Sequence, residues 1–235
     1  MDCVWKVPAI LQRSDVVFAE TDAAARADGL RESTARCLEV DARLHALYDD
    51  FDKSISGPLY WPQLSGVDGP AEDAALGKIF PVSFFFPAFP VAQALIVYWL
   101  SLMVLHGQLA RNYGQMARAA AMATARGAPP GDGDGGGGSA EAYGARARQS
   151  LATMEANARC ICQAVEYMLQ ETMGWLGTYA MLSPLAGTLN CYQQAFGERR
   201  AREAAWIQHF MHQIEGRCNF EAKSLWEADG DGPDK

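Results

Sequence analysis

The sequence is poor in basic residues. It carries 20 lysines and arginines against 28 aspartates and glutamates, which gives a net charge of −8. Surfaces that bind nucleic acids cluster lysine and arginine to meet the phosphates, so this composition argues against direct nucleic-acid contact by the chain. Apolar residues make up 49% of the 235 positions and charged residues 20%, a balance typical of a soluble globular protein and not of a disordered one.

Cysteine motifs are also missing. No C-x-x-C pair occurs, which excludes a zinc ribbon, a zinc finger or a binuclear zinc cluster within this sequence. The first residues lack the basic segment and the apolar core of a signal peptide, so we expect a reducing compartment and no disulfide framework. The six cysteines are then expected to act as small apolar core residues: Cys3, Cys37, Cys160, Cys162, Cys191 and Cys218.

An unbroken apolar run of membrane-spanning length is absent too. Ile79–Leu105 holds no charge, but Pro81, Pro87 and Pro90 interrupt its first half. The remaining part, Val91–Leu105, would reach only about 22 Å as a helix, short of a bilayer core of about 30 Å. We therefore predict a buried core helix, with a membrane-associated helical protein as an alternative.

What the sequence does contain is helical periodicity. Apolar residues recur at steps of three and four along five segments, and Gly29 is a point at which the first of these could divide. We predict no strand, because the short apolar segment Val82–Phe86 is flanked by prolines and shows no alternation. Ser183 and Pro184 have the residue types of a helix start, and Gly197 that of a helix end. The predicted helices are Thr21–Phe51, Pro90–Arg126, Ala145–Met173, Ser183–Gly197 and Glu198–Arg217.

These segments predict an all-α fold, a bundle or array of antiparallel helices around one long buried central helix. We expect a single helical domain over residues 1–226. Residues 127–141 (GAPPGDGDGGGGSAE) offer no large apolar side chain to bury, so we predict a flexible loop there. The acidic end, residues 227–235, is predicted to be disordered.

Two clusters have residue types that bind metal ions. Asp49, Asp50 and Asp52 resemble the aspartate-rich box with which helical prenyl-diphosphate enzymes hold magnesium. The third acid is one place early and Lys53 stands where another acid is expected. We favour a solvated helix end, with a magnesium-dependent diphosphate-binding enzyme as an alternative.

The second cluster lies near the end of the chain. His209, His212, Glu215 and Cys218 follow one another at helical spacing, which would suit zinc. We favour an ordinary amphipathic helix, because Ile207, Phe210, Met211 and Ile214 form an apolar stripe beside these residues. The glycine run fits neither a phosphate-binding loop nor a calcium loop, since the required Lys and Glu are missing.

Few residues suggest catalysis. Only four histidines are present and no Gly-x-Ser-x-Gly nucleophile motif occurs. We assign no catalytic, cofactor or metal-binding residue, and expect neither enzymatic activity nor a cofactor. Tyr98, Trp99 and Met103 could line a hydrophobic pocket for a ligand or partner between helices, although ordinary core packing explains such a stripe equally well.

Three stretches together resemble a known family. They are Arg36–Phe51 (RCLEVDARLHALYDDF) with Gly57–Trp61 (GPLYW), Phe84–His106 (FFFPAFPVAQALIVYWLSLMVLH), and Ala158–Leu169 (ARCICQAVEYML) with the segment through Gly187. In the same order, they resemble the C-terminal helical regulatory region of fungal zinc binuclear-cluster transcription factors. The resemblance spans roughly residues 1–220. Each motif is apolar and helical and is common by itself, so the resemblance rests on the order in which the motifs occur.

The resemblance implies a non-enzymatic regulatory or effector domain, located in the nucleus or else the cytoplasm. Its partners would be proteins of the transcription machinery or a small hydrophobic ligand. We expect no membrane contact, and the sequence does not fix the oligomeric state. The cysteine cluster with which that family reads DNA is absent from this chain, so no DNA-reading or zinc-binding residue carries over.

Overall fold

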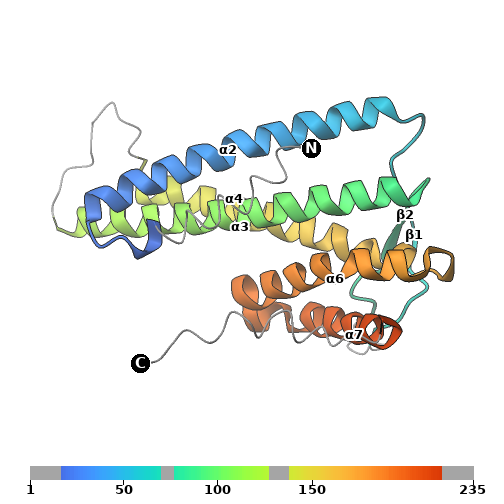
Figure 1. Cartoon of the computed structure of the whole chain (residues 1–235). Helices are drawn as coiled ribbons and strands as arrows, with labels where there is room; N and C mark the ends of the chain where they lie inside the picture. Colours follow the sequence, from blue (N-terminus) through green and yellow to red (C-terminus); the bar gives the residue numbers. More distant parts are fainter. Residues whose placement is uncertain (1–16, 70–76, 127–137, 219–235) are drawn as a thin grey trace, which may run out of the picture. The chain divides into compact units, whose positions relative to one another are not determined.

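The computed structural model describes residues 17–69, 77–126 and 138–218, and the chain forms two compact units (Figure 1). The first unit contains Met1–Ser56 and Ser101–Asn157, and the second contains Gly57–Leu100 and Ala158–Lys235. The predicted single domain over residues 1–226 stays a prediction. Most of the expected loop at 127–141 and the whole expected tail at 227–235 lie outside the described residues.

Helix α2, Ala23–Ser54, opens the first unit. The Asp22 carboxylate caps it by accepting hydrogen bonds from the backbone N–H groups of Ala24 and Ala25. Its buried side includes Leu30, Cys37 and Leu44, which follow one another at steps of seven residues. The helix continues through Gly29 without a break, and a Cβ built on this glycine would meet a methyl group of Val17 at 2.9 Å. The glycine marks a close contact and not a break.

Helix α3, Phe89–Ala125, lies within one residue of its predicted bounds at each end. In the first unit it buries Leu102, Leu105 and Leu109, and in the second it buries Leu95 and Trp99. The all-round apolar sequence is explained by this burial on several sides.

Helix α4 differs from its prediction at both ends. It spans Ala140–Gln163 and not Ala145–Met173. It starts earlier because the Ser139 hydroxyl accepts a hydrogen bond from the backbone N–H of Ala142, a capping contact. It ends earlier because the chain turns at Ala164 into the one-turn helix α5, Val165–Met168, and the 3₁₀ turn Glu171–Met173.

The helix predicted to begin at Ser183 begins nine residues earlier, so this prediction is wrong. Helix α6 spans Gly174–Cys191 and holds Pro184 in its interior. Pro184 cannot donate a helical hydrogen bond, yet it is buried, and the packing of the whole helix outweighs the lost bond. Gly174, the residue after the predicted end of the preceding helix, takes a positive φ of 53° at the start of this one.

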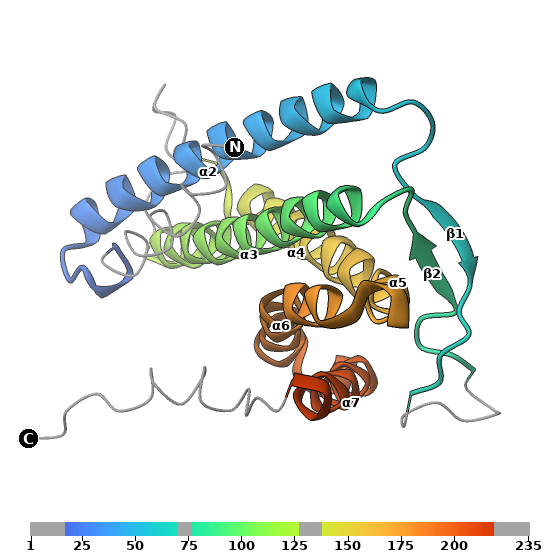
Figure 2. The same cartoon turned by 45° about the vertical axis from the view of Figure 1, so that its right-hand side comes forward.

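The chain after α6 remains helical to its last described residue. A π-helical turn, Tyr192–Phe196, ends at Gly197, whose φ of 53° confirms it as a terminator. A 3₁₀ turn, Gly197–Arg200, leads into helix α7, Ala201–Cys218. Within the second unit α6 and α7 pack side by side (Figures 1 and 2).

A small hairpin in the second unit contradicts the prediction of no strands. Strand β1, Trp61–Leu64, pairs antiparallel with β2, Val82–Phe85, and Trp61 lies opposite Phe85. Figure 2 shows the pair beside α5. Apolar buried and polar exposed residues do not alternate along β2: its most buried position is Ser83 and not a hydrophobic residue. The predicted all-α class with a long central helix is confirmed, with this hairpin as an addition.

Candidate interaction surface

The three residues predicted to line a ligand pocket are placed on α3. Trp99 and Met103 are buried and Tyr98 is half-buried. The Trp99 indole lies among the rings of Tyr60, Phe84 and Phe86, with centroid distances of 5.7, 5.9 and 6.3 Å. These are the contacts of an aromatic core. Met103 belongs to the other compact unit, and a pocket at the three residues stays a prediction.

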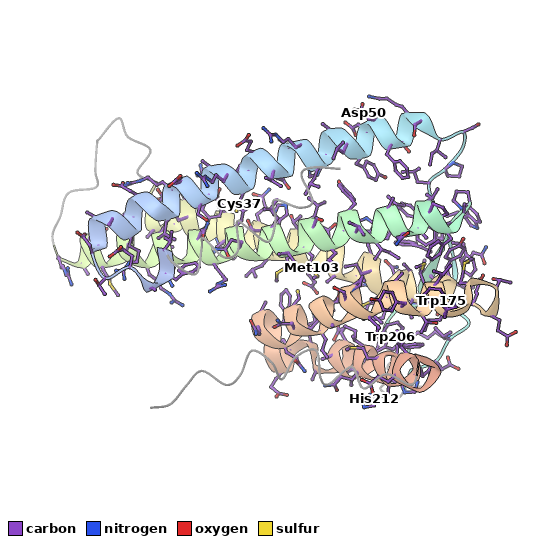
Figure 3. All side chains as sticks on the ribbon, in the orientation of Figure 1. Cys37, Asp50, Met103, Trp175, Trp206 and His212 are labelled. Carbon is purple, nitrogen blue, oxygen red and sulfur yellow. The ribbon has the colours of Figure 1, made fainter. Side chains whose placement is uncertain are left out.

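The aspartate cluster lies at the C-terminal end of α2. Asp49, Asp50 and Asp52 are all exposed, and Figure 3 labels Asp50 on the last turns of the helix. In the ranges that the structure describes, no three His, Cys, Asp or Glu side chains are arranged to hold a metal ion. The exposed positions are those expected for a solvated helix end.

The two histidines of α7 have local partners. His209 Nε2 lies 2.8 Å from Gln213 Nε2, and His212 Nδ1 lies 2.7 Å from the carbonyl oxygen of Gln208. The side chain of Cys218, the fourth predicted ligand, is outside the described residues. The apolar stripe beside them, Ile207, Phe210, Met211 and Ile214, is buried as predicted.

Three of the cysteines are poor nucleophiles. Burial raises the pKa of the Cys37 thiol to about 11 and that of Cys160 to about 11, and it raises the pKa of Cys162 well above the ordinary value. The thiolate is the reactive form of cysteine, so these residues are inert at neutral pH.

One titratable pair in the first unit joins two helices. His106 Nε2 on α3 lies 3.1 Å from Asp41 Oδ1 on α2. Because an ionised carboxylate has no hydrogen, Nε2–H is the donor. This hydrogen bond, together with the charges of His106 and His45, lowers the pKa of Asp41. Within the described residues, the other ring nitrogen of His106, Nδ1, is buried without a hydrogen-bond partner.

We expect this pair to give the first unit an acid-sensitive contribution to stability. A carboxyl whose pKa is lower in the folded state contributes stability above its unfolded pKa, here 3.8, and loses it as the pH falls further. Asp41→Asn should therefore cost about 1 kcal/mol at pH 7. Urea unfolding at several pH values should show the gap between wild type and variant closing below pH 3.8. A gap that stays constant would contradict the assignment.

A buried polar network also ties α2 to α3. The Asn112 Nδ2 amide donates to Ser33 Oγ at 3.0 Å and to Thr34 Oγ1 at 3.3 Å, while Gln108 Nε2 donates to Asn112 Oδ1 at 2.7 Å. All four side chains are buried. Such a network fixes the register of two helices, because a shift would leave buried polar groups unpaired.

The second unit has its own polar centre at Glu166 on α5. Its carboxylate accepts hydrogen bonds from Ser83 Oγ at 2.5 Å, from Ser65 Oγ at 3.1 Å and from the backbone N–H of Gly66 at 3.1 Å. Lys78 Nζ donates to the carbonyl oxygens of Ser65 and Val67 in the same loop. These contacts fix the loop after β1 against α5. Ser83 is buried, so the arrangement is structural.

One feature of the second unit that its internal contacts do not explain is the outer face of α6. Trp175 is 70% exposed, Leu176 50% and Tyr179 65%. Single exposed apolar residues are ordinary, but three large ones on adjacent positions of one helix face form a patch, and such patches mark binding sites. We call these three residues the α6 patch.

The position of Gly177 shows which side of α6 packs against the rest of the unit. A Cβ built on Gly177 would lie 2.0 Å from the carbonyl oxygen of Met168, so the first turn of α6 packs closely against the end of α5. Thr178 and Met181 are buried on the same side. With Gly177 turned inward, helix geometry of 100° per residue places positions 175 and 179 about 160° away from it and position 176 about 100° away.

The patch was missed in the sequence because its helix was predicted to start too late. One signal was available: no charged residue occurs between Glu171 and Glu198. A helix that is uncharged all round can be buried on all sides or can expose an apolar face, and periodicity alone does not distinguish the two.

One helix in the described residues has the length and hydropathy of a membrane span. It is α3, and half of its most apolar window is buried inside the protein. A core helix of a soluble protein meets the same criteria, so this observation is weak and the membrane-associated alternative gains little from it.

Figure 3 labels Trp175 at the start of α6 and Trp206 on α7, an exposed and a buried tryptophan of the second unit. The geometry therefore offers a surface for binding and places it on one helix. Comparison of the chain with family models, with curated protein sequences and with solved structures finds no match in any of the three.

Proposed function

We propose that this chain is a non-enzymatic regulatory domain that acts by binding another protein through the α6 patch. The observation that carries the proposal is the exposure of Trp175, Leu176 and Tyr179 on one uncharged helix face. Tryptophan and tyrosine dominate the binding energy of protein interfaces, and the centres of interfaces are depleted of charge.

The shape of the patch favours a protein over a small ligand. Small-molecule sites are concave and bury most of the ligand. The patch lies on the outer face of a helix, where side chains project into solvent, and a partner with its own groove or flat surface fits it better. The resemblance to fungal transcription factors supports a role in transcription regulation, and therefore the nucleus as the location.

A tethered reporter assay tests this proposal. The full chain is fused to an unrelated DNA-binding domain in a fungal host, and we expect transcription of a reporter to change several-fold relative to the DNA-binding domain alone. The double variant Trp175→Ser/Tyr179→Ser should lose this change, because truncating one interface hot spot costs about 2 kcal/mol or more, roughly 30-fold in affinity.

The matched control is Gln193→Ser/Gln194→Ser, two exposed polar residues of the π-helical turn just after α6. It should keep the wild-type output at equal protein level. A wild-type fusion with no effect on the reporter would overturn the regulatory role. Loss of output in the control as well as in the patch variant would overturn the assignment to the patch.

A further inference from the structure

We infer that the partner of the α6 patch is a second copy of this chain, with the two α6 helices packed antiparallel about a twofold axis near Ser183. The inference rests on the proposed function, because it names the occupant of the same surface. It follows from the distribution of side-chain size, charge and area along the exposed face.

The exposed face of α6 has a bulky end and a small end. At 100° per residue, most of the exposed or half-buried positions of α6 fall within one arc of about 140°, and Gly174, Leu189 and Cys191 lie outside it. The first part of this arc carries Trp175, Leu176 and Tyr179, and the second part carries small or short side chains. The arc consists of Trp175, Leu176, Tyr179, Ala180, Ser183, Gly187 and Asn190.

A twofold axis matches these two ends to each other. Ser183 is exposed and lies near the middle of the arc, both along the helix and around it. If it faces its own copy, positions equally far before and after it face each other. Tyr179 then lies opposite Gly187, and Leu176 lies opposite Asn190. Large side chains meet small ones, as the closely packed core of an interface requires, and the contact is self-complementary.

Charge distinguishes this face from the exposed apolar residues of α2. Two copies with a net charge of −8 repel each other, so a self-contact is favoured where carboxylates are absent. No charged residue occurs between Glu171 and Glu198. In contrast, exposed Leu38 adjoins Glu39, and exposed Leu47 lies just before Asp49 and Asp50.

The area available predicts a weak dimer. From the exposed fractions of the three large side chains, the patch offers about 400 Å² per copy, given 150–250 Å² for an aromatic side chain. A standard interface buries about 800 Å² per partner, and the small half of the face supplies part of the difference. We therefore expect a dissociation constant in the micromolar range, on the order of 10 μM.

Sedimentation velocity over a concentration series tests the inference, together with a swap of side chains across the axis. The wild type should shift from monomer to dimer with concentration. Tyr179→Ala should remain monomeric because it removes the bulky side, and Gly187→Tyr should remain monomeric because it places two large rings opposite each other. The double variant Tyr179→Ala/Gly187→Tyr should dimerise again, because large and small have exchanged places. Circular dichroism melting confirms that each variant is folded.

Cysteine cross-linking locates the axis. Ser183→Cys should form a symmetric disulfide-linked dimer under mild oxidation, whereas Ala201→Cys, an exposed position at the start of α7, should not. The wild type, which has the same natural cysteines, is the background. A monomeric wild type throughout the series, failure of the double variant to regain the dimer, or equal cross-linking at 183 and 201 would overturn the inference.

The two proposals fail in different ways. If the wild type stays monomeric while the tethered reporter still depends on Trp175 and Tyr179, the second copy is the wrong partner and the binding role stands. If the dimer forms as described but the reporter never responds, the contact between copies stands and the regulatory role fails.

Discussion

Gly177→Ala is expected to lower the free energy of unfolding of the second unit by about 3 kcal/mol or more. In a helix, alanine would ordinarily be the more stable residue by up to 1 kcal/mol. Here its Cβ would lie 2.0 Å from the carbonyl oxygen of Met168 and 2.8 Å from the Cβ of Met173. Both contacts are with rigid parts of the chain, so the first turn of α6 must move away from α5.

The measurement is urea unfolding followed by circular dichroism, with Gly114→Ala as the control. Gly114 is also inside a helix, α3, and an added Cβ there would meet no atom within 4 Å. The control should be neutral or slightly stabilising. Because movement of the first turn also displaces the α6 patch, the Gly177 variant should lose reporter output. Equal stability of the two variants would contradict the close packing of α6 on α5.

Trp206→Ala is expected to have an effect of similar size, a loss of about 3–5 kcal/mol, because it leaves a large cavity in a packed core. Trp206 is only 2% exposed. Its ring centroid lies 4.7 Å from that of Phe80 and 4.2 Å from that of Phe210. A Cβ on Gly69 would lie 2.2 Å from the Trp206 ring, so the loop after β1 also closes on this side chain.

Trp175→Ala is the matched comparison, since it removes the same side chain from an exposed position of the same unit. It should change the free energy of unfolding by no more than about 0.5 kcal/mol, as surface substitutions do, while it weakens partner binding. Thermal or urea unfolding of the two variants, beside the reporter assay, separates the core tryptophan from the surface one. If Trp175→Ala destabilised the chain as much as Trp206→Ala, the α6 patch would be part of the core.

The sequence predicted the long helices well where local signals were unambiguous. The bounds of α2 and α3 differ from the predicted ones by at most three residues, because Asp22 caps the first and Pro90 opens the second. Prediction failed between Ala164 and Pro184, where one helix was predicted to continue to Met173 and the next to begin only at Ser183. Gly177 allows α6 to pack closely against α5, and Pro184 is buried inside α6. Both roles depend on tertiary contacts, which rules based on neighbouring residues in the sequence do not describe.

The hairpin and the candidate surface were missed for a related reason. Trp61 and Phe85 lie opposite each other in the hairpin although a long stretch of chain separates them, and the sequence shows no alternation of apolar and polar residues that would predict the pairing. Tyr98, Trp99 and Met103 were chosen because they are large and apolar on a helix, whereas Trp175 and Tyr179 are equally large and apolar but exposed. Residue type alone does not separate the two groups, because which side of an uncharged helix faces solvent is decided by its packing partners.

The order in which the ribosome makes the chain has a consequence for the Glu166 contacts. Ser65 and Glu166 are 101 positions apart, and the second unit is assembled from two separate stretches of sequence with part of the first unit, Ser101–Asn157, between them. The hairpin therefore emerges long before its anchoring carboxylate exists. During synthesis the residues of the hairpin therefore stay exposed in the nascent chain, where chaperones can bind them and they can associate wrongly, until the C-terminal helices have been translated and can cover them.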